Sequence, residues 1–287
     1  MGGKLRAVAW FSAVELLGHP ATLLLTLASA VGTLILPFFQ FQRFSEDGRL
    51  ARDCGLSTAL LFGTLLALGG AGRLHRALRD GTCAIALAKP LSRGLWFCGN
   101  ALGTALALGV YLLTQGAATI LAEAYSPRYH AGGEYADVAA LFGAVGAALG
   151  ALALAALNDR FRGGRFALSA NLLLPVALWA LVPFAPGAHW GDLTALAAVA
   201  MLLAQAAAFA LALAVRCPPG LTAGVTLAAL AATLAYLGGA AYLPLDPLAG
   251  GGAVPVRTLL LLAPQACLAT AFFLWCGVGL LNARETL

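Results

Sequence analysis

The chain has 287 residues, of which 61% are hydrophobic and 10% are charged, whereas soluble domains average about 45–50% apolar and about 25% charged residues. This excess of apolar residues excludes a soluble globular domain and predicts an integral membrane protein whose main solvent is the lipid bilayer. The net charge of +5 is small, and the basic residues lack the interleaved aromatic side chains of a nucleic-acid surface, so no nucleic-acid partner is expected.

The expected fold class is all-α: a polytopic bundle of transmembrane helices with both termini in the cytoplasm. The six cysteines contain no C-x-x-C pair and lie mostly in or beside apolar segments. We therefore interpret them as small apolar residues and not as a disulfide framework or a zinc site.

Residues 1–20 precede the first long apolar segment and are expected to form an interfacial helix on the cytoplasmic leaflet. The segment has a loose apolar face, carries Arg6 near its start and Glu15 near its end, and stops at Gly18-His19-Pro20. Its apolar run is too long for a cleavable signal peptide. The alternative is an unstructured basic N-terminus that only sets the topology.

The remaining residues, 21–287, are expected to form one transmembrane domain. A spanning helix needs about 20 predominantly apolar residues. The fourth and fifth apolar segments are short and rich in Ala and Gly, so they could instead form one re-entrant hairpin, which would leave six spans. The eight expected spans are 21–41, 54–71, 95–122, 138–157, 166–185, 193–215, 221–243 and 258–281.

The placement of Lys and Arg sets the expected orientation, because cytoplasmic loops carry an excess of these residues. With both termini inside, an even number of spans places most of the basic residues on the cytoplasmic side. The expected location is the inner (plasma) membrane, crossed several times. The residues expected inside are Lys4, Arg6, the five basic residues of 72–93, Arg160, Arg162, Arg165, Arg216 and Arg284.

The cytoplasmic loop over residues 72–93 is the densest cluster of basic residues between two apolar segments. Read as a helix, it has one apolar face and one basic face, formed by Arg73, Arg76 and Arg79. Pro90 would end such a helix, and Gly81 is expected to mark a bend because mid-helix Gly costs roughly 1 kcal/mol relative to Ala. The charge alone would also satisfy the positive-inside rule without any further function.

Chemically reactive patterns are scarce. No ionisable residue lies near the middle of an expected span, which argues against a proton- or sodium-coupled transporter. The sequence has no P-loop motif, and its four histidines lie in separate loops, so neither catalysis nor a bound metal or cofactor is expected. Four polar residues are candidates for a polar lining, although each is more expected to hydrogen-bond between helices. They are Thr114, Gln115, Asn171 and Gln205.

Three short motifs follow one another in and after this loop: D-G-T over residues 80–82, A-K-P-L-S-R over 88–93 and G-N-A-L-G over 99–103. They resemble the acidic-Gly-Thr turn, the S-K-P-V-S-R stretch and the G-K-x-L-G entry to the third span in the ABC-2 type transporter permease family. The N-terminal helix is similar to the family's interfacial helix, and N-A-R-E over 282–285 to its Arg-Glu ending. Two features differ: Asn100 stands where Lys is usual, and eight spans exceed the six of the simplest members.

The resemblance implies a membrane subunit of an ATP-binding cassette transporter. Such permeases pair with a second permease copy and bind cytoplasmic P-loop ATPase subunits, which hold ATP and Mg²⁺. The loop between the second and third spans acts as a coupling helix seated on the ATPase. The residues expected there are Arg73, Arg76, Arg79, Asp80, Gly81 and Thr82, with Lys89, Pro90 and Arg93 framing the return to the membrane.

The expected function is export of a substrate that the sequence does not identify; related systems serve copper-enzyme maturation or export drugs, lipids or polysaccharide. The alternative is a polytopic membrane protein that works without an ATPase, either a secondary transporter or an assembly scaffold.

Overall fold

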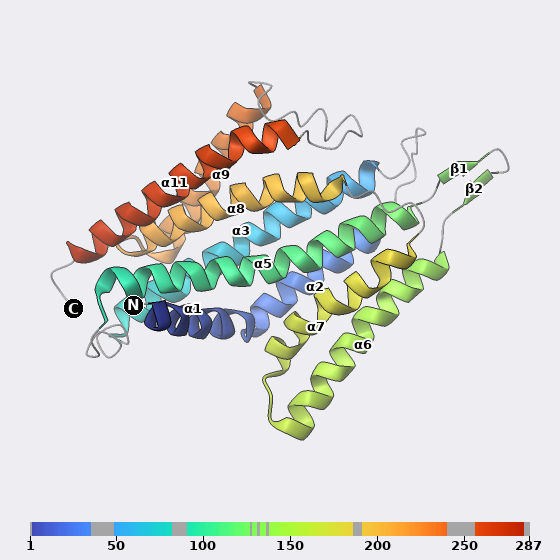
Figure 1. Cartoon of the computed structure of the whole chain (residues 1–287), viewed down its shortest axis with the longest axis horizontal. Helices are drawn as coiled ribbons and strands as arrows, with labels where there is room; N and C mark the ends of the chain where they lie inside the picture. Colours follow the sequence, from blue (N-terminus) through green and yellow to red (C-terminus); the bar gives the residue numbers. More distant parts are fainter. Residues whose placement is uncertain are drawn as a thin grey trace.

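The structure is a computed structural model that describes residues 2–35, 49–81, 91–126, 128–130, 133–135, 138–185, 191–239 and 256–283. This part of the chain is an elongated helical bundle with one short hairpin of strands (Figure 1). Its helices are α1 (Gly2–Leu17), α2 (Pro20–Ile35), α3 (Arg49–Arg79), α5 (Arg93–Tyr125), α6 (Val138–Arg162), α7 (Phe166–Leu181), α8 (Asp192–Ala214), α9 (Pro219–Gly239) and α11 (Val256–Asn282), and a 3₁₀ turn (Val182–Phe184) extends α7.

Six of these helices are long and apolar enough to cross a membrane: α3, α5, α6, α7 with its 3₁₀ turn, α8 and α11. α1 and α2 meet at a bend of 66° and would add a seventh crossing if counted as one span. The expected first and seventh spans fall on α2 and α9, whose described apolar parts are shorter than a spanning helix requires. α6 and α7 form an antiparallel pair, and each is long enough to cross alone. The long apolar helices fit a membrane-embedded protein.

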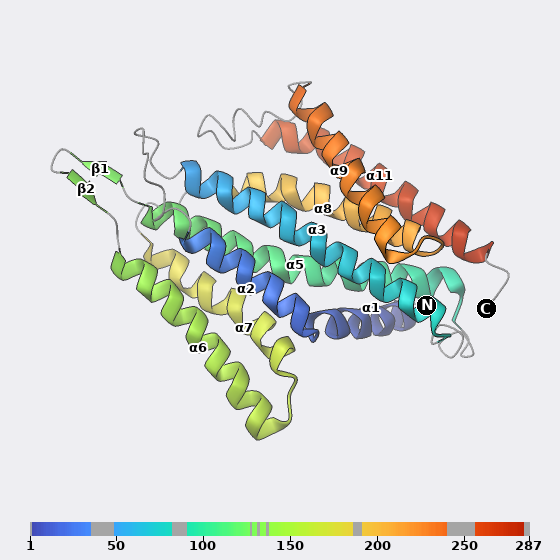
Figure 2. The same ribbon diagram turned by 180° about the vertical axis from the view of Figure 1, so that it is seen from behind.

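α5 is the central helix. It contacts α1, α2, α3, α6, α7, α8 and α11, and α2 and α3 lie together on one of its faces (Figure 2). The α6–α7 pair and the α9–α11 pair flank this centre on opposite sides. Large apolar side chains on these outer helices are exposed, for example Phe161 at 78% and Trp275 at 74%. Such surfaces suit lipid and not water.

α1 is a separate helix that lies along the first part of α5 (Figure 1). The helix ends at Leu17, one residue before the predicted stop signal. Its position at the membrane interface stays a prediction. α1 approaches α5 closely because two glycines of α5 face it. A Cβ added to Gly103 would lie 2.5 Å from the Cβ of Ser12 and 2.7 Å from the carbonyl oxygen of Ala9. The Gly99–Gly103 pair is therefore the contact surface for α1.

α3 is longer than the sequence predicts. The predicted second span ended at residue 71, but the helix continues to Arg79, so the first two turns of the expected cytoplasmic loop belong to the spanning helix. Gly81 follows the end of the helix by two residues, and its φ of +70° is a left-handed conformation that glycine adopts readily. The chain therefore leaves the helical path at the residue where the sequence predicts a bend. α5 then begins after Ser92, whose Oγ accepts a hydrogen bond from the backbone N–H of Leu95 at 3.3 Å.

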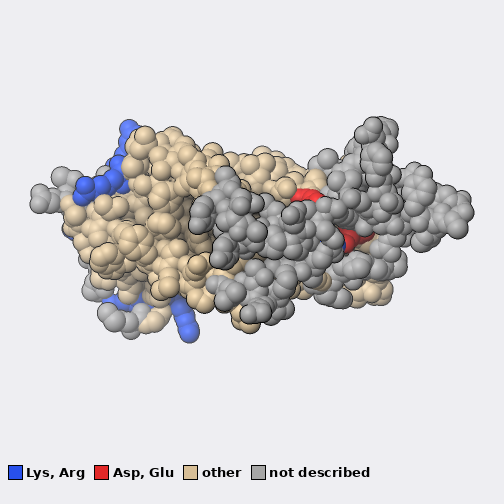
Figure 3. Space-filling model, turned by 90° about the horizontal axis from the view of Figure 1, so that it is seen from above, with Lys and Arg blue, Asp and Glu red and all other residues tan. Residues whose placement is uncertain are grey.

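Exposed basic side chains gather at one end of the bundle (Figure 3). The start of α1 and the end of α11 lie at this same end, on the left in Figure 1. The opposite end carries an antiparallel hairpin of β1 (Arg128–His130) and β2 (Gly133–Tyr135), in a segment expected to be an external loop. The exposed basic residues of the described chain are Lys4, Arg6, Arg76, Arg79 and Arg216 and, at the turn between α6 and α7, Arg160, Arg162 and Arg165.

We predict that Gly103→Ala destabilises the protein by about 1–3 kcal/mol, because the added methyl group meets the backbone of α1. Thermal unfolding of the purified protein in detergent would show a lower Tm. Gly109→Ala is the matched control, since a Cβ at this position of the same helix meets nothing within 4 Å. Equal Tm values for the two variants would contradict the close α1–α5 contact.

Candidate functional site

The C-terminal end of α3 is joined to α1 and α5 by one arginine. Nη1 of Arg73 donates a hydrogen bond to Oε2 of Glu15 at 2.7 Å, and Nη2 donates to Oδ1 of Asn100 at 2.9 Å. Nη2 also donates to Oγ of Ser12. The side chain of Arg73 is 12% exposed and that of Glu15 is 48% exposed. We call these four residues the Arg73 cluster.

Asn100 is oriented by its own helix. Its Nδ2 donates to the backbone carbonyl of Trp96 at 2.9 Å, which leaves Oδ1 facing the guanidinium of Arg73. A lysine at this position, as in the ABC-2 pattern, has no acceptor atom and would place a second positive charge beside Arg73. Asn100 thus supplies the guanidinium of Arg73 with an uncharged acceptor.

The same end of α3 is also fixed to α8. Nδ1 of His75 lies 2.9 Å from the backbone carbonyl oxygen of Ala214. Leu74 and Leu78 are buried in a cluster that includes Phe97 of α5. The last turns of α3 are therefore held by α1, α5 and α8 together.

Arg73 is the main correction to the predicted coupling residues. The sequence placed it on an exposed basic face beside Arg76 and Arg79, but α1 covers it and supplies its carboxylate partner. The prediction missed this because an interfacial helix was not expected to pack onto the loop.

The other predicted coupling residues lie at the edges of the described part. Arg76, Arg79 and Asp80 are exposed at the end of α3, and Arg93 is the first residue of α5. Arg6 is exposed on α1. Thr82, Lys89 and Pro90 lie outside the described residues.

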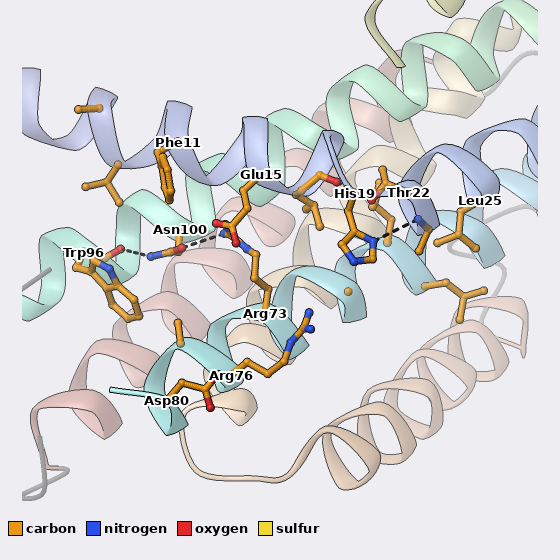
Figure 4. A pocket seen from close by; sticks show the side chains of 18 of the residues that line it. Phe11, Glu15, His19, Thr22, Leu25, Arg73, Arg76, Asp80, Trp96 and Asn100 are labelled. Atoms are coloured by element: carbon orange, nitrogen blue, oxygen red, sulfur yellow. Dashed lines mark hydrogen bonds and ion pairs between the residues drawn. The ribbon is translucent and has the colours of Figure 1, made fainter. Parts of the chain in front are cut away.

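A cavity of about 750 Å³ lies beside the Arg73 cluster, between α1, α2, α3 and α5 (Figure 4). One part of its wall is apolar and includes Phe11 and Leu25; another part is polar and includes His19, Arg76 and Asp80. The cavity occupies the bend between α1 and α2. Its volume falls within the range of about 300–1,000 Å³ typical of small-molecule sites.

Gln115 is the centre of a buried polar network that joins α2, α3 and α5. Its Nε2 lies within hydrogen-bond distance of Oγ1 of Thr33 at 2.6 Å, Oγ1 of Thr58 at 3.0 Å and the carbonyl oxygen of Gly55 at 3.1 Å. Its Oε1 accepts a hydrogen bond from Oγ of Ser29 at 2.7 Å. The network confirms the prediction that Gln115 forms hydrogen bonds between helices, here from α5 to α2 and α3.

The other three candidate lining residues have different roles. Thr114 donates to the backbone of its own helix at Val110, and Asn171 donates to the backbone of α1 at 2.8 Å. Both are buried, and neither lines the cavity beside the Arg73 cluster. Gln205 does line one, a space of about 180 Å³ between α8, α9 and α11.

A buried ionic triad lies at the opposite end from the Arg73 cluster. Nη2 of Arg52 is 2.5 Å from Oε1 of Glu123, and Nε of Arg52 is 2.7 Å from Oδ1 of Asp192. The three residues are 7%, 3% and 4% exposed, respectively. The second oxygens of both carboxylates have no hydrogen-bond partner in the described part of the chain. One guanidinium thus faces two buried carboxylates.

Sequence reasoning missed this triad. It placed Arg52 and Asp192 just outside the expected spans. The structure corrects this placement, because α3 begins at Arg49 and α8 begins at Asp192, so both residues lie inside the first turns of long helices. The available signal was the clustering of one Arg and two acids at span boundaries on the same predicted side. Within the described ranges, no three His, Cys, Asp or Glu side chains come together as a metal site requires.

No protein-family model, curated protein or solved structure matches this chain. The interpretation of its function therefore depends on the residues themselves and on their geometry.

We predict that Arg52→Met lowers the free energy of unfolding by about 3–5 kcal/mol, since it leaves two buried carboxylates without a cation. Adding Glu123→Gln and Asp192→Asn to this variant should restore most of the loss by removing both charges. Denaturant titration in detergent would measure the three stabilities. The control Arg79→Met changes an exposed residue of the same helix and should shift stability by less than about 0.5 kcal/mol. A triple variant no more stable than Arg52→Met would contradict the ionic account.

We also predict that Gln115→Leu destabilises the bundle by about 1–2 kcal/mol, because hydroxyl groups on α2 and α3 lose their shared amide partner. Gln205→Leu is the matched control: no hydrogen bond joins this side chain to another described residue, so little change is expected. Comparing the Tm of both variants in the same detergent tests the network. Similar losses would show that volume, and not hydrogen bonding, sets the effect.

Proposed function

We propose that this chain is the membrane-spanning permease subunit of an ABC-2 type transporter of the exporter class, acting on a substrate that the sequence does not identify. In this proposal a separate cytoplasmic P-loop ATPase binds ATP and Mg²⁺ and supplies the energy, and a second permease copy completes the assembly in the inner (plasma) membrane. The observation that carries the proposal is the construction of the C-terminal end of α3: fixed on three sides within the bundle and exposed at its end.

This construction suits mechanical coupling. Arg76, Arg79 and Asp80 are exposed where a partner can contact them. Behind them, Arg73 and His75 join α3 to α1, α5 and α8, so a displacement of this end would move several helices together. A partner that closes on ATP binding would then bias the arrangement of the bundle.

The charge distribution supports the orientation that the proposal requires. Blue side chains in Figure 3 lie toward the end of the bundle at which α3 ends, and further exposed arginines, Arg160, Arg162 and Arg165, lie at the turn between α6 and α7. Under the positive-inside rule this end faces the cytoplasm, where a soluble ATPase would bind.

A second candidate is a secondary transporter that works without an ATPase. The Arg52 triad favours it, since buried carboxylates within helical bundles are typical of proton and ion pathways. Neutralising Glu123 and Asp192 separates the two candidates: it would abolish transport by a proton-coupled protein but leave ATPase binding intact.

The proposal predicts that co-expression with candidate ATPases, followed by purification through a tag on this chain in mild detergent, recovers a stoichiometric P-loop subunit. A double variant with Arg79→Glu and Asp80→Lys should reduce the recovered ATPase at least tenfold, because both charges at the exposed end of α3 are reversed. Arg162→Glu is the matched control, an exposed arginine at the end of α6 on the same side. Arg73→Met should retain the ATPase but remove the ATP-dependent change in hydrogen exchange of α1.

Two outcomes would contradict the proposal. One is that no candidate ATPase is retained by the unmodified chain. The other is that the double variant and Arg162→Glu lose the ATPase to the same extent, which would indicate a general charge effect.

A further inference from the structure

The cavity beside the Arg73 cluster combines two kinds of wall. Leu25 of α2 and Leu65 and Leu66 of α3 form apolar surface, whereas His19 and Arg76 present polar nitrogen atoms. Figure 4 shows the side chain of Arg76 extending from α3 across the cavity toward the side on which His19 lies. Such a site fits a molecule that is apolar at one end and anionic at the other.

Four charged side chains line the cavity: Glu15, Arg73, Arg76 and Asp80. Arg73 is already paired with Glu15 at 2.7 Å. Neither Arg76 nor Asp80 has an ion-pair partner among the described residues, so Arg76, whose side chain is exposed, is the cation open to an anionic ligand. A phosphate group is the natural partner for such a guanidinium, since it accepts two parallel hydrogen bonds.

The apolar wall continues out of the cavity along α3. Leu61, Leu65 and Gly69 follow at intervals of four residues and therefore lie on one face of the helix, with Arg76 beyond them. Leu61 is 55% exposed and Leu65 is 38% exposed. At 1.5 Å per residue, Arg76 lies about 22 Å from Leu61 along the axis. Half of a bilayer with its headgroups is also about 20–22 Å thick.

The position of α1 places the cavity at the depth of the lipid headgroups. The helix bends by 66° away from α2, and its Trp10 and Phe11 are 67% and 68% exposed. Exposed Trp is enriched at membrane–water interfaces. The bend between α1 and α2, which encloses the cavity, therefore lies where phosphate groups of lipids are found.

From these observations we propose that the cavity binds one glycerophospholipid, with its phosphate at Arg76 and His19 and one acyl chain along Gly69, Leu65 and Leu61. The proposal commits to a lipid and not to a soluble phosphate compound, because the apolar face of α3 is continuous with the cavity. Arg76 also belongs to the exposed end of α3 that the proposed ATPase would contact. Lipid retention is measured without an ATPase, so this proposal stands or falls separately from the proposed transport function.

Gly69 makes the site testable without disturbing the bundle. A Cβ at Gly69 meets nothing within 4 Å, so Gly69→Phe would place a ring in the cavity. A Cβ at Gly72 likewise meets nothing within 4 Å, but Gly72 does not line the cavity, so Gly72→Phe is a matched control on the same helix. Arg76→Gln and Arg79→Gln form a second matched pair.

The experiment measures lipid retained by the purified full-length chain and its variants. Each protein is delipidated in detergent, incubated with palmitoyl-oleoyl phosphatidylglycerol, and analysed by native mass spectrometry. We expect one retained lipid per chain, and an at least tenfold loss of retention in Gly69→Phe and Arg76→Gln. The two control variants should stay within twofold of the unmodified protein. Circular dichroism and gel filtration verify that each variant is folded.

Two further compounds test the contributions of the phosphate and of the acyl chains separately. Diacylglycerol with the same chains lacks the phosphate and should be retained at least tenfold less. Glycerol 3-phosphate lacks the chains and should not displace the phospholipid at millimolar concentration. The proposal is overturned if Gly69→Phe and Gly72→Phe retain equal lipid, if diacylglycerol binds as well as phosphatidylglycerol, or if glycerol 3-phosphate displaces the lipid.

Discussion

The ion pair between Arg73 and Glu15 is the contact on which the basic end of the molecule depends. α1 has 16 residues, and an isolated helix of this length is marginally stable at best in water. It is held by the guanidinium of Arg73 and by the close approach to Gly99 and Gly103. Both the cavity at the bend and the fixed position of the α3 end follow from this attachment. Without Glu15 and Asn100, Arg73 would be a largely buried cation without compensation.

The α3–α5 pair carries polar contacts along its whole length. At one end Arg73 of α3 meets Asn100 of α5, and at the other Arg52 of α3 meets Glu123 of α5. Between them, Gln115 of α5 bonds to the backbone of α3. Hydrogen bonds and ion pairs join α3 and α5 at three positions along their length. The two helices would therefore move as one rigid unit, and a displacement at one end would be transmitted to the other. This arrangement would serve either an ATPase-driven or an ion-driven change of shape.

Several elements were predictable because their signals are local. Long apolar runs predicted eight spans, and six of these fall on helices that are long and apolar enough to cross a membrane. A change of direction was expected at Gly81, where the structure has a left-handed backbone conformation. The length of α3 was underestimated because basic residues were taken to end a span. A helix can continue beyond the apolar region when a neighbouring helix supplies a carboxylate, as α1 does for Arg73.

Composition and periodicity by themselves determined the class of protein, the main helices and the side on which basic residues gather, because these depend on each segment's preference for lipid or water. Tertiary structure alone decided which charged residues are partnered. Arg52, Glu123 and Asp192 are distant in sequence, and only the packing of α3, α5 and α8 brings Arg52 within 2.5 Å of Glu123 and 2.7 Å of Asp192. Pairing of charges depends on distance in space, which no local pattern encodes.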